Sequence, residues 1–167
     1  MANPFYISTA ISYTNGPPHI GHAYEVIAAD AIARFKRLDG YDVFFLTGTD
    51  EHGLKVQKKA QELGIDPKKY VDEISKEFIQ LSLSLNCSND DFIRTTDERH
   101  VKNVQSIWKI LFDKGDIYLD QYSGWYSITD EAFYNEEELI KIESNSFLSP
   151  NGSPVEWVDE ESYFFKL

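Results

Sequence analysis

Apolar residues follow two different periods along the first part of the chain. The stretch Phe5–Tyr13 is rich in aromatic and β-branched residues, which favours a buried strand, and Asp42–Thr47 predicts a second one. Between them, apolar side chains return at helical spacing from about Gly21 to Leu38, after turn residues at Thr14–Pro18. This order of strand, helix and strand predicts a parallel pair joined by a right-handed crossover.

Helical periodicity continues further along the chain and gives way to short strands after Gly115. The expected helices are Leu54–Leu63, Pro67–Leu85 and Glu98–Lys114. The expected strands are Ile117–Leu119, Tyr122–Ile128 and Val155–Val158, with Ser144–Pro154 as a loop. We therefore expect an α/β fold with a domain boundary near Lys114, residues 1–114 forming one domain and residues 115–167 the start of another.

The last residues of the chain are aromatic and carry no polar tail. Phe164–Leu167 differs in this respect from the loose, polar ends of most domains. We expect the 167 residues to be the N-terminal fragment of a longer protein, truncated within the second domain.

Acidic residues are concentrated in the final third. Residues 1–119 carry 17 acidic and 14 basic side chains, whereas residues 120–167 carry 11 and 2. The second segment would repel a phosphate backbone, so nucleic acid is an unfavourable partner for it. The nearly neutral first segment is free of this restriction.

Several classes of protein are excluded by composition. No apolar run approaches the ~20 residues of a membrane-spanning helix, and the first residues lack a secretory signal pattern. Cys87 is the only cysteine, which rules out an intramolecular disulfide and a cysteine-based zinc cluster in this chain. We expect a cytoplasmic protein without a membrane partner.

Three of the four histidines follow the two predicted parallel strands. His19 and His22 lie in the turn after the first strand, and His52 follows the second. In an open α/β sheet, ligands bind at the carboxyl ends of the strands. His19 and His22 are three residues apart at a predicted helix start, where free backbone N–H groups attract anions. This pattern favours a phosphate site, although a pair of surface histidines or a metal site also fits it.

The second turn carries an acidic residue between glycines. Gly48 and Gly53 flank the segment and permit a close approach of the backbone, and Asp50 is placed to pair with an ammonium group. An ordinary N-cap also fits this pattern taken alone. The parallel pairing brings this turn beside the first one.

The two turns resemble motifs of a known enzyme family. His19-Ile20-Gly21-His22 resembles the His-Ile-Gly-His motif of the class I aminoacyl-tRNA synthetases, and the wider segment 13–24 is similar to the methionyl-tRNA synthetases. Residues 48–55 resemble the second motif of that family, with Lys55 where the isoleucine, valine and leucine enzymes typically carry proline. Two further motifs, in residues 124–131 and 156–165, are similar to the family's insertion. The resemblance thus runs the length of the chain.

This resemblance implies a fold and a reaction. The fold would be the first half of a Rossmann-like parallel-sheet nucleotide-binding domain, followed by the beginning of a mixed α+β connective-peptide insertion. The reaction would be the activation of L-methionine with ATP to methionyl-adenylate and its transfer to methionine tRNA. Mg²⁺ would accompany ATP, and most tRNA contacts would lie outside this chain.

The resemblance also implies roles for the residues of the first turn. His19 and His22 would be catalytic, contacting the ATP phosphates and stabilising the transition state. Gly21 would let the adenosine lie against the helix.

Other positions would form the methionine site by the same resemblance. Asp50 would hold the methionine ammonium group, and Ile11 and Tyr13 would border the methionine side chain. His52 falls in the same motif and would lie near the site.

Two departures from the family pattern accompany these roles. Ser127 and Asp130 stand where many members carry zinc-binding cysteines, so the chain resembles the zinc-free branch and no structural zinc is expected. The Lys-Met-Ser-Lys-Ser loop, which supplies further phosphate contacts, is absent from these residues. We therefore expect the chain alone to be inactive.

Two other functions fit the sequence. One is a non-catalytic module that binds a nucleotide or a protein. The other is a different nucleotidyltransferase with a His-x-Gly-His turn.

Overall fold

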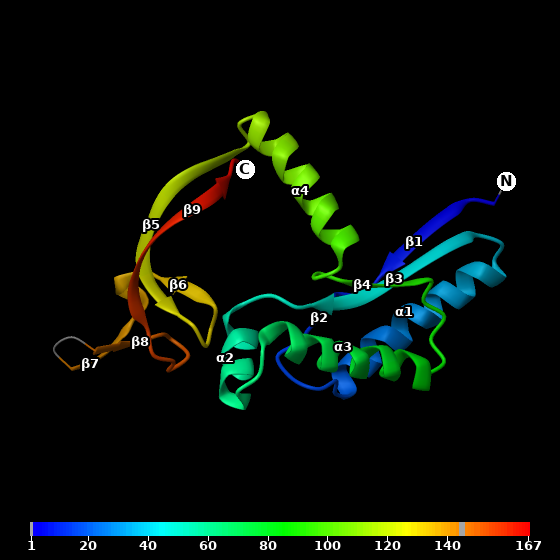
Figure 1. Ribbon diagram of the computed structural model, residues 1–167, viewed down its shortest axis with the longest axis horizontal. Coiled ribbons are helices and arrows are strands. Elements are labelled where there is room, and N and C mark those ends of the chain that lie inside the picture. The colour runs from blue at the N-terminus through cyan, green and yellow to red at the C-terminus, as the bar shows by residue number, and fades with distance from the viewer. Residues whose placement is uncertain (1, 144–145) are drawn as a thin grey trace. The chain divides into compact units, whose positions relative to one another are not determined.

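The computed structural model describes residues 2–143 and 146–167 (Figure 1). The chain divides into two compact units, with the division between Lys102 and Asn103. The first unit contains β1 (Pro4–Ser8), β2 (Ser12–Tyr13), α1 (Ile20–Leu38), β3 (Asp42–Asp50), α2 (Leu54–Leu63), α3 (Pro67–Ser84), β4 (Asp91–Arg94) and the start of α4 (Glu98–Asp113). The second contains the rest of α4, β5 (Ile117–Ser127), β6 (Ala132–Tyr134), the 3-10 turn η1 (Glu136–Glu138), β7 (Ile140–Glu143), β8 (Ser146–Leu148) and β9 (Glu156–Phe165).

The strand β3 is the centre of a parallel sheet in the first unit. It pairs in parallel with β1, β2 and β4. Leu46 is aligned with Ser8 on one side and with Asp91 on the other, so β4 lies on the edge opposite β1. All four strands therefore run in the same direction, with the last residues of β2 and β4 aligned with Asp50 and Thr49 at the end of β3, and the predicted parallel pairing is confirmed.

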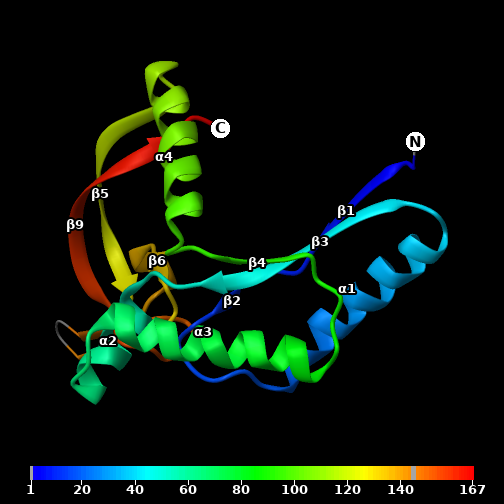
Figure 2. The same cartoon turned by 45° about the vertical axis from the view of Figure 1, so that its right-hand side comes forward.

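Helices cover one face of this sheet. Alternate residues of β3 point toward them, beginning with Val43 and the fully buried Phe45, which packs against Val26, Ala29 and Ala33 of α1. Figures 1 and 2 both show α1 and α3 on this side of the strands. A second apolar cluster joins α2 to α3, and Tyr13 and Phe92 pack against it. Burial of a side chain such as Phe45 contributes about 2–3 kcal/mol.

The helix ends follow from local side chains. Asp66 caps α3 by accepting a hydrogen bond from the Lys69 N–H (3.1 Å), and Pro67 occupies the first turn, where no N–H is needed. Gly64 ends α2 in a left-handed conformation, at a φ of 67°. In the described part of the chain, no helix is long and apolar enough to cross a membrane.

The expected single strand over residues 5–13 is wrong. Two short strands, β1 and β2, run along the same edge of β3, and their registers differ by one residue. The extra residue lies in segment 9–11, where the Ala10 N–H turns to the Glu25 carboxylate (2.8 Å) instead of the sheet. The strand is also less buried than expected, because Tyr6 stays 60% exposed.

The strand β4 was not expected. Its sequence, Asp-Phe-Ile-Arg, is short and charged at both ends, which hides the strand pattern. It approaches β3 very closely, because a Cβ on Gly48 would lie 2.0 Å from the Ile93 carbonyl oxygen. Gly48 is therefore required by the pairing of β3 with β4.

The second unit is built on a long antiparallel ribbon. β5 pairs with β9 over ten residues and with β6 at its far end, while β7 pairs with β8. Aromatic residues pack along it: Trp108 and Phe112 of α4 contact Tyr163 edge-on, with ring centroids 5.2 and 6.2 Å apart. The prediction that strands follow Gly115 is thus confirmed.

The bounds expected for these strands need correction. The two short strands over 117–128 form one strand, β5, because the polar residues between them pair with β9. The strand expected at 155–158 extends to Phe165, and part of the expected loop, Ser146–Leu148, is a strand. Residues 144 and 145 of that loop lie outside the described residues.

A carboxylate holds the corner after β5 together. Asp130 accepts hydrogen bonds from the hydroxyls of Tyr134 (2.9 Å), Ser149 (2.5 Å) and Ser153 (2.7 Å), and its own N–H donates to Ser127 (3.3 Å). Ser127 and Ser149 are fully buried. The pKa of Asp130 is lowered to about 2, chiefly by the Ser149 and Ser153 hydrogen bonds. These contacts connect two turns that are 19 residues apart in the sequence.

Gly48→Ala should lower the stability of the first unit by about 3 kcal/mol, because a methyl group cannot share space with the Ile93 carbonyl. Urea unfolding followed by circular dichroism measures this change. Gly16→Ala is the matched control, since a Cβ there meets nothing within 4 Å. Equal stability of the two variants would contradict the predicted close approach.

Asp130→Asn should loosen the corner after β5, because an amide NH₂ cannot accept the hydroxyl hydrogen bonds. Hydrogen exchange of residues 146–153 should accelerate, whereas Asp120→Asn, which alters a contact with the adjacent Gln121 N–H, should not affect it. Since the pKa of Asp130 is depressed, its contribution is complete above pH 3.8 and is lost as the pH falls toward about 2. An acid transition unchanged in Asp130→Asn would count against this.

Candidate functional site

The residues predicted for the site gather at the carboxyl ends of the parallel strands. Tyr13 is aligned with Asp50 across β2 and β3, and the Thr14 N–H donates to the Asp50 carbonyl (3.0 Å). His22 lines a small hollow together with Ser12 and Gly48. The structure therefore brings the first helix turn, β2 and the end of β3 to one edge.

The two histidines of the first turn cap the helix α1 reciprocally. Nδ1 of His19 accepts a hydrogen bond from the Gly21 N–H (3.1 Å), and Nδ1 of His22 accepts one from the His19 N–H (3.1 Å). Their rings stack with centroids 3.8 Å apart. An acceptor nitrogen carries a lone pair, so each neutral ring holds its proton on Nε2. Both imidazoles thus present an Nε2–H donor away from the backbone.

Gly21 has a steric role in this cap. A Cβ at this position would lie 2.9 Å from Cε1 and 3.0 Å from Nδ1 of His19. The glycine therefore provides the space that the His19 ring occupies.

His22 favours its neutral form. Burial lowers its pKa, the neighbouring His19 lowers it further, and Glu25 opposes them. Its ring also meets Phe78 of α3 edge-on, with centroids 5.0 Å apart. His22 is thus a rigid hydrogen-bond donor.

The second turn holds Asp50 and His52 on either side of a buried acid. The Asp50 carboxylate is half-buried and accepts from the His52 N–H at 3.5 Å, and among the described residues it forms no ion pair. Gly53 adopts a φ of 116°, and a Cβ there would lie 2.6 Å from the Tyr13 hydroxyl. Ile11 is 42% exposed, between β1 and β2.

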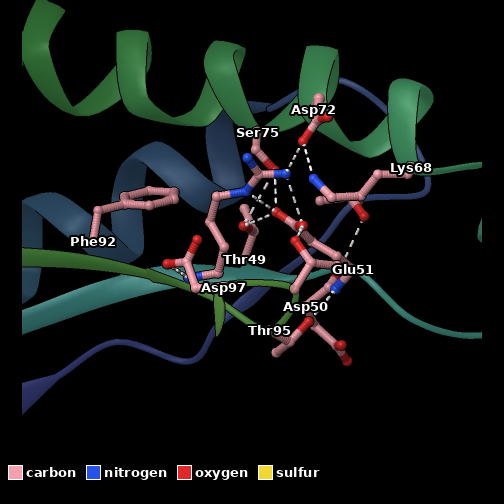
Figure 3. Close-up of polar contacts among 12 residues, drawn as sticks. Thr49, Asp50, Glu51, Lys68, Asp72, Ser75, Phe92, Thr95 and Asp97 are labelled. Atoms are coloured by element: carbon pink, nitrogen blue, oxygen red, sulfur yellow. Dashed lines mark hydrogen bonds and ion pairs between the residues drawn. The ribbon is translucent and has the colours of Figure 1, made fainter. Parts of the chain in front are cut away.

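Glu51, between these two residues, is the most extensively bonded side chain of the unit (Figure 3). Its carboxylate is fully buried and accepts hydrogen bonds from Arg94 Nε (2.6 Å) and Nη2 (2.9 Å) and from the hydroxyls of Thr49, Ser75 and Thr96. Burial alone would raise the pKa of Glu51, but these bonds, led by Arg94, outweigh it and lower the pKa. Arg94 also contacts Asp72 of α3 (2.5 Å).

Sequence reasoning did not identify Glu51, Arg94 or Thr95. A signal was present, because period-two alternation puts Glu51 on the same face as Phe45, Thr47 and Thr49. An acid on the covered face needs a basic partner, and Arg94 directly follows the apolar pair Phe92-Ile93. Choosing it among the bases requires knowledge of β4.

The cap of α1 should weaken on acidification. Since the pKa of His22 is below the ordinary value of 6.5, its contribution is complete above pH 6.5 and is lost as the pH falls through the lowered value. Amide exchange in the first turn of α1, corrected for intrinsic rates, should then increase. The first turn of α3, capped by Asp66, is the internal control over pH 5–7. Parallel behaviour of both turns would contradict this assignment.

Comparisons with known proteins point to one enzyme family. A family model described as tRNA synthetases class I (M) matches residues 5–148. The methionine--tRNA ligase of Rhizobium meliloti is 58% identical over 99% of this chain, and that of Rickettsia conorii is 54% identical over all of it. The chain spans 32% of the length of each of these relatives.

Solved structures give the same result. The Mycobacterium tuberculosis methionyl-tRNA synthetase in complex with methionyl-adenylate is 51% identical, with a TM-score of 0.88 over 98% of this chain and 32% of that one. The expected fold, a Rossmann-like start followed by a mixed insertion, is therefore confirmed. Because the family model covers most of the chain, we conclude that this chain belongs to the methionyl-tRNA synthetases of class I.

Proposed function

We propose that this chain forms part of the active site of an enzyme that activates L-methionine with ATP and transfers it to methionine tRNA. The observation that carries the proposal is the reciprocal cap, which leaves two Nε2–H donors beside the start of α1. A helix start and two oriented donors stabilise negative charge on a phosphate. In the reaction, a methionine carboxylate oxygen attacks the α-phosphorus of ATP and pyrophosphate leaves.

We assign the remaining site residues by the same argument. His19 and His22 donate to the phosphates, and Gly21 keeps the helix start open to adenosine. The Asp50 carboxylate, which has no basic partner among the described residues, binds the methionine ammonium group.

Ile11 and Tyr13 border the methionine side chain in this proposal. A thioether needs apolar, polarisable neighbours more than hydrogen bonds. His52 lies beside Asp50 at the same edge. The methionyl group of the adenylate is then transferred to a hydroxyl of the terminal ribose of tRNA, and AMP leaves.

Mg²⁺ belongs to the ATP substrate in this proposal. The described residues contain no group of three or more His, Cys, Asp or Glu side chains that could hold a metal ion. Mg²⁺ is commonly bound through substrate phosphates and few protein groups. We infer that Mg²⁺ arrives with ATP. We also propose that the whole enzyme acts in the cytoplasm, where it would meet its tRNA.

We also propose that residues 1–114 are the first half of the catalytic domain and residues 115–167 the start of the connective insertion. The change from the parallel sheet, which ends at Arg94, to the antiparallel ribbon, which begins at Ile117, supports a division in this part of the chain. Methionine-dependent ATP–pyrophosphate exchange by the isolated chain would contradict its proposed dependence on the rest of the enzyme.

His19→Asn tests the role of the imidazole, because asparagine also caps helices well but lacks Nε2–H. In a complete synthetase that contains this chain, we expect methionine-dependent ATP–pyrophosphate exchange to fall about 10²–10³-fold, as for removal of one oriented donor. Thermal stability should stay nearly unchanged.

Asp66→Asn is the control for this experiment, since it exchanges the same kind of cap at the remote helix α3. Its exchange rate should equal that of the unaltered enzyme. If His19→Asn also kept the full rate, the proposed role of His19 would be refuted. If the unaltered enzyme bound ATP but showed no exchange, a non-catalytic nucleotide-binding module would be favoured.

A further inference from the structure

The tripeptide Arg94-Thr95-Thr96, at the end of β4, forms hydrogen bonds with the end of β3. Arg94 and Thr96 bind the Glu51 carboxylate, as described above, while the Thr95 hydroxyl accepts a hydrogen bond from the Glu51 backbone N–H (2.9 Å). The Thr95 N–H in turn donates to the Thr49 carbonyl (3.2 Å). Both the side chain and the backbone of Glu51 are therefore fixed.

The same Thr95 hydroxyl contacts His52. Its oxygen lies 3.1 Å from Nδ1 of the imidazole, and Thr95 is 8% exposed. The oxygen already accepts from the Glu51 N–H, and its own hydrogen can be donated to Nδ1 of His52. Among the described residues, this hydroxyl has two hydrogen-bond partners, the Glu51 N–H and Nδ1 of His52, so donation to Nδ1 gives the buried hydroxyl hydrogen an acceptor.

From this geometry we propose that Thr95 is a positioning residue that holds His52 as the Nε2–H tautomer and aims that donor beside Asp50. Glu51 and Arg94 support this arrangement by fixing the strand end from which His52 projects. The inference rests on the proposed function for its catalytic meaning, but the tautomer itself does not depend on it.

His100 provides a contrast within the same region. Its Nδ1 lies 3.2 Å from the Thr95 carbonyl oxygen, which can only accept a hydrogen bond. His100 must therefore carry its proton on Nδ1. Thr95 thus selects opposite tautomers for two histidines, with its hydroxyl for His52 and its carbonyl for His100.

The tautomers can be read directly by ¹⁵N NMR of histidine side chains in the complete protein that contains this chain. The His52 signals, identified by their loss in His52→Gln, should show a bare Nδ1 and a protonated Nε2 at neutral pH. His100 should show the reverse. A protonated Nδ1 on neutral His52 would overturn the proposal without any change to Thr95.

Thr95→Val and Thr95→Ser form a matched pair, because valine keeps the shape and loses the hydroxyl while serine keeps the hydroxyl. We expect Thr95→Val to convert His52 into a mixture of tautomers and to raise the KM for methionine roughly three- to tenfold, the effect of one lost hydrogen bond. Thr95→Ser should retain the tautomer and the KM. A purely structural role would lower the stability of Thr95→Val and leave the His52 tautomer unchanged.

The two proposals fail in different ways. If the unaltered protein shows the expected tautomer but no methionine-dependent exchange, the proposed function is wrong and the positioning role of Thr95 stands. If exchange is normal and Thr95→Val leaves the His52 tautomer and the KM unchanged, the inference on Thr95 is wrong and the function stands.

Discussion

The packing of the first unit depends on the buried carboxylate of Glu51 and the hydrogen bonds that it accepts. Removing such a charge from water costs several kcal/mol, and only a complete set of donors offsets this cost. Those donors come from β3, α3, the end of β4 and the residue Thr96, which are dispersed over 48 positions of the chain. Because each donor is needed, these segments can pack in one arrangement, and the edge of the sheet that carries Asp50 and His52 is rigid as a result.

The three histidines at this edge share one structural principle. In each, Nδ1 is engaged by the protein: by backbone N–H groups for His19 and His22, and by the Thr95 hydroxyl for His52. The contact that orients the ring also decides where its proton lies. Nε2–H is thereby left for a ligand, and helix capping and ligand binding use opposite sides of the same imidazole.

The second unit uses a carboxylate differently. Asp130 accepts hydrogen bonds from hydroxyl and amide donors at the turn after β5, and no buried polar side-chain atom among the described residues lacks a partner. Most acidic side chains of this unit lie exposed on η1 and β9. Exposed acids remain solvated and disfavour a phosphate backbone, which leaves the first unit as the side of this chain suited to phosphate.

The sequence alone determined the helices, the parallel βαβ start and the family, because helical periodicity and the two turn motifs are local. It did not reveal β4, the break between β1 and β2, or the length of β5 and β9. These depend on partners: a charged strand such as β4 is stable only once Arg94 meets Glu51, and polar residues of β5 extend the strand only opposite β9. The candidate ligands His19, His22, Asp50 and His52 could be listed from the motifs, whereas the atoms that orient the three imidazoles could not. Hydrogen bonds between residues 43 positions apart, such as that of Thr95 with His52, exist only after the chain has folded.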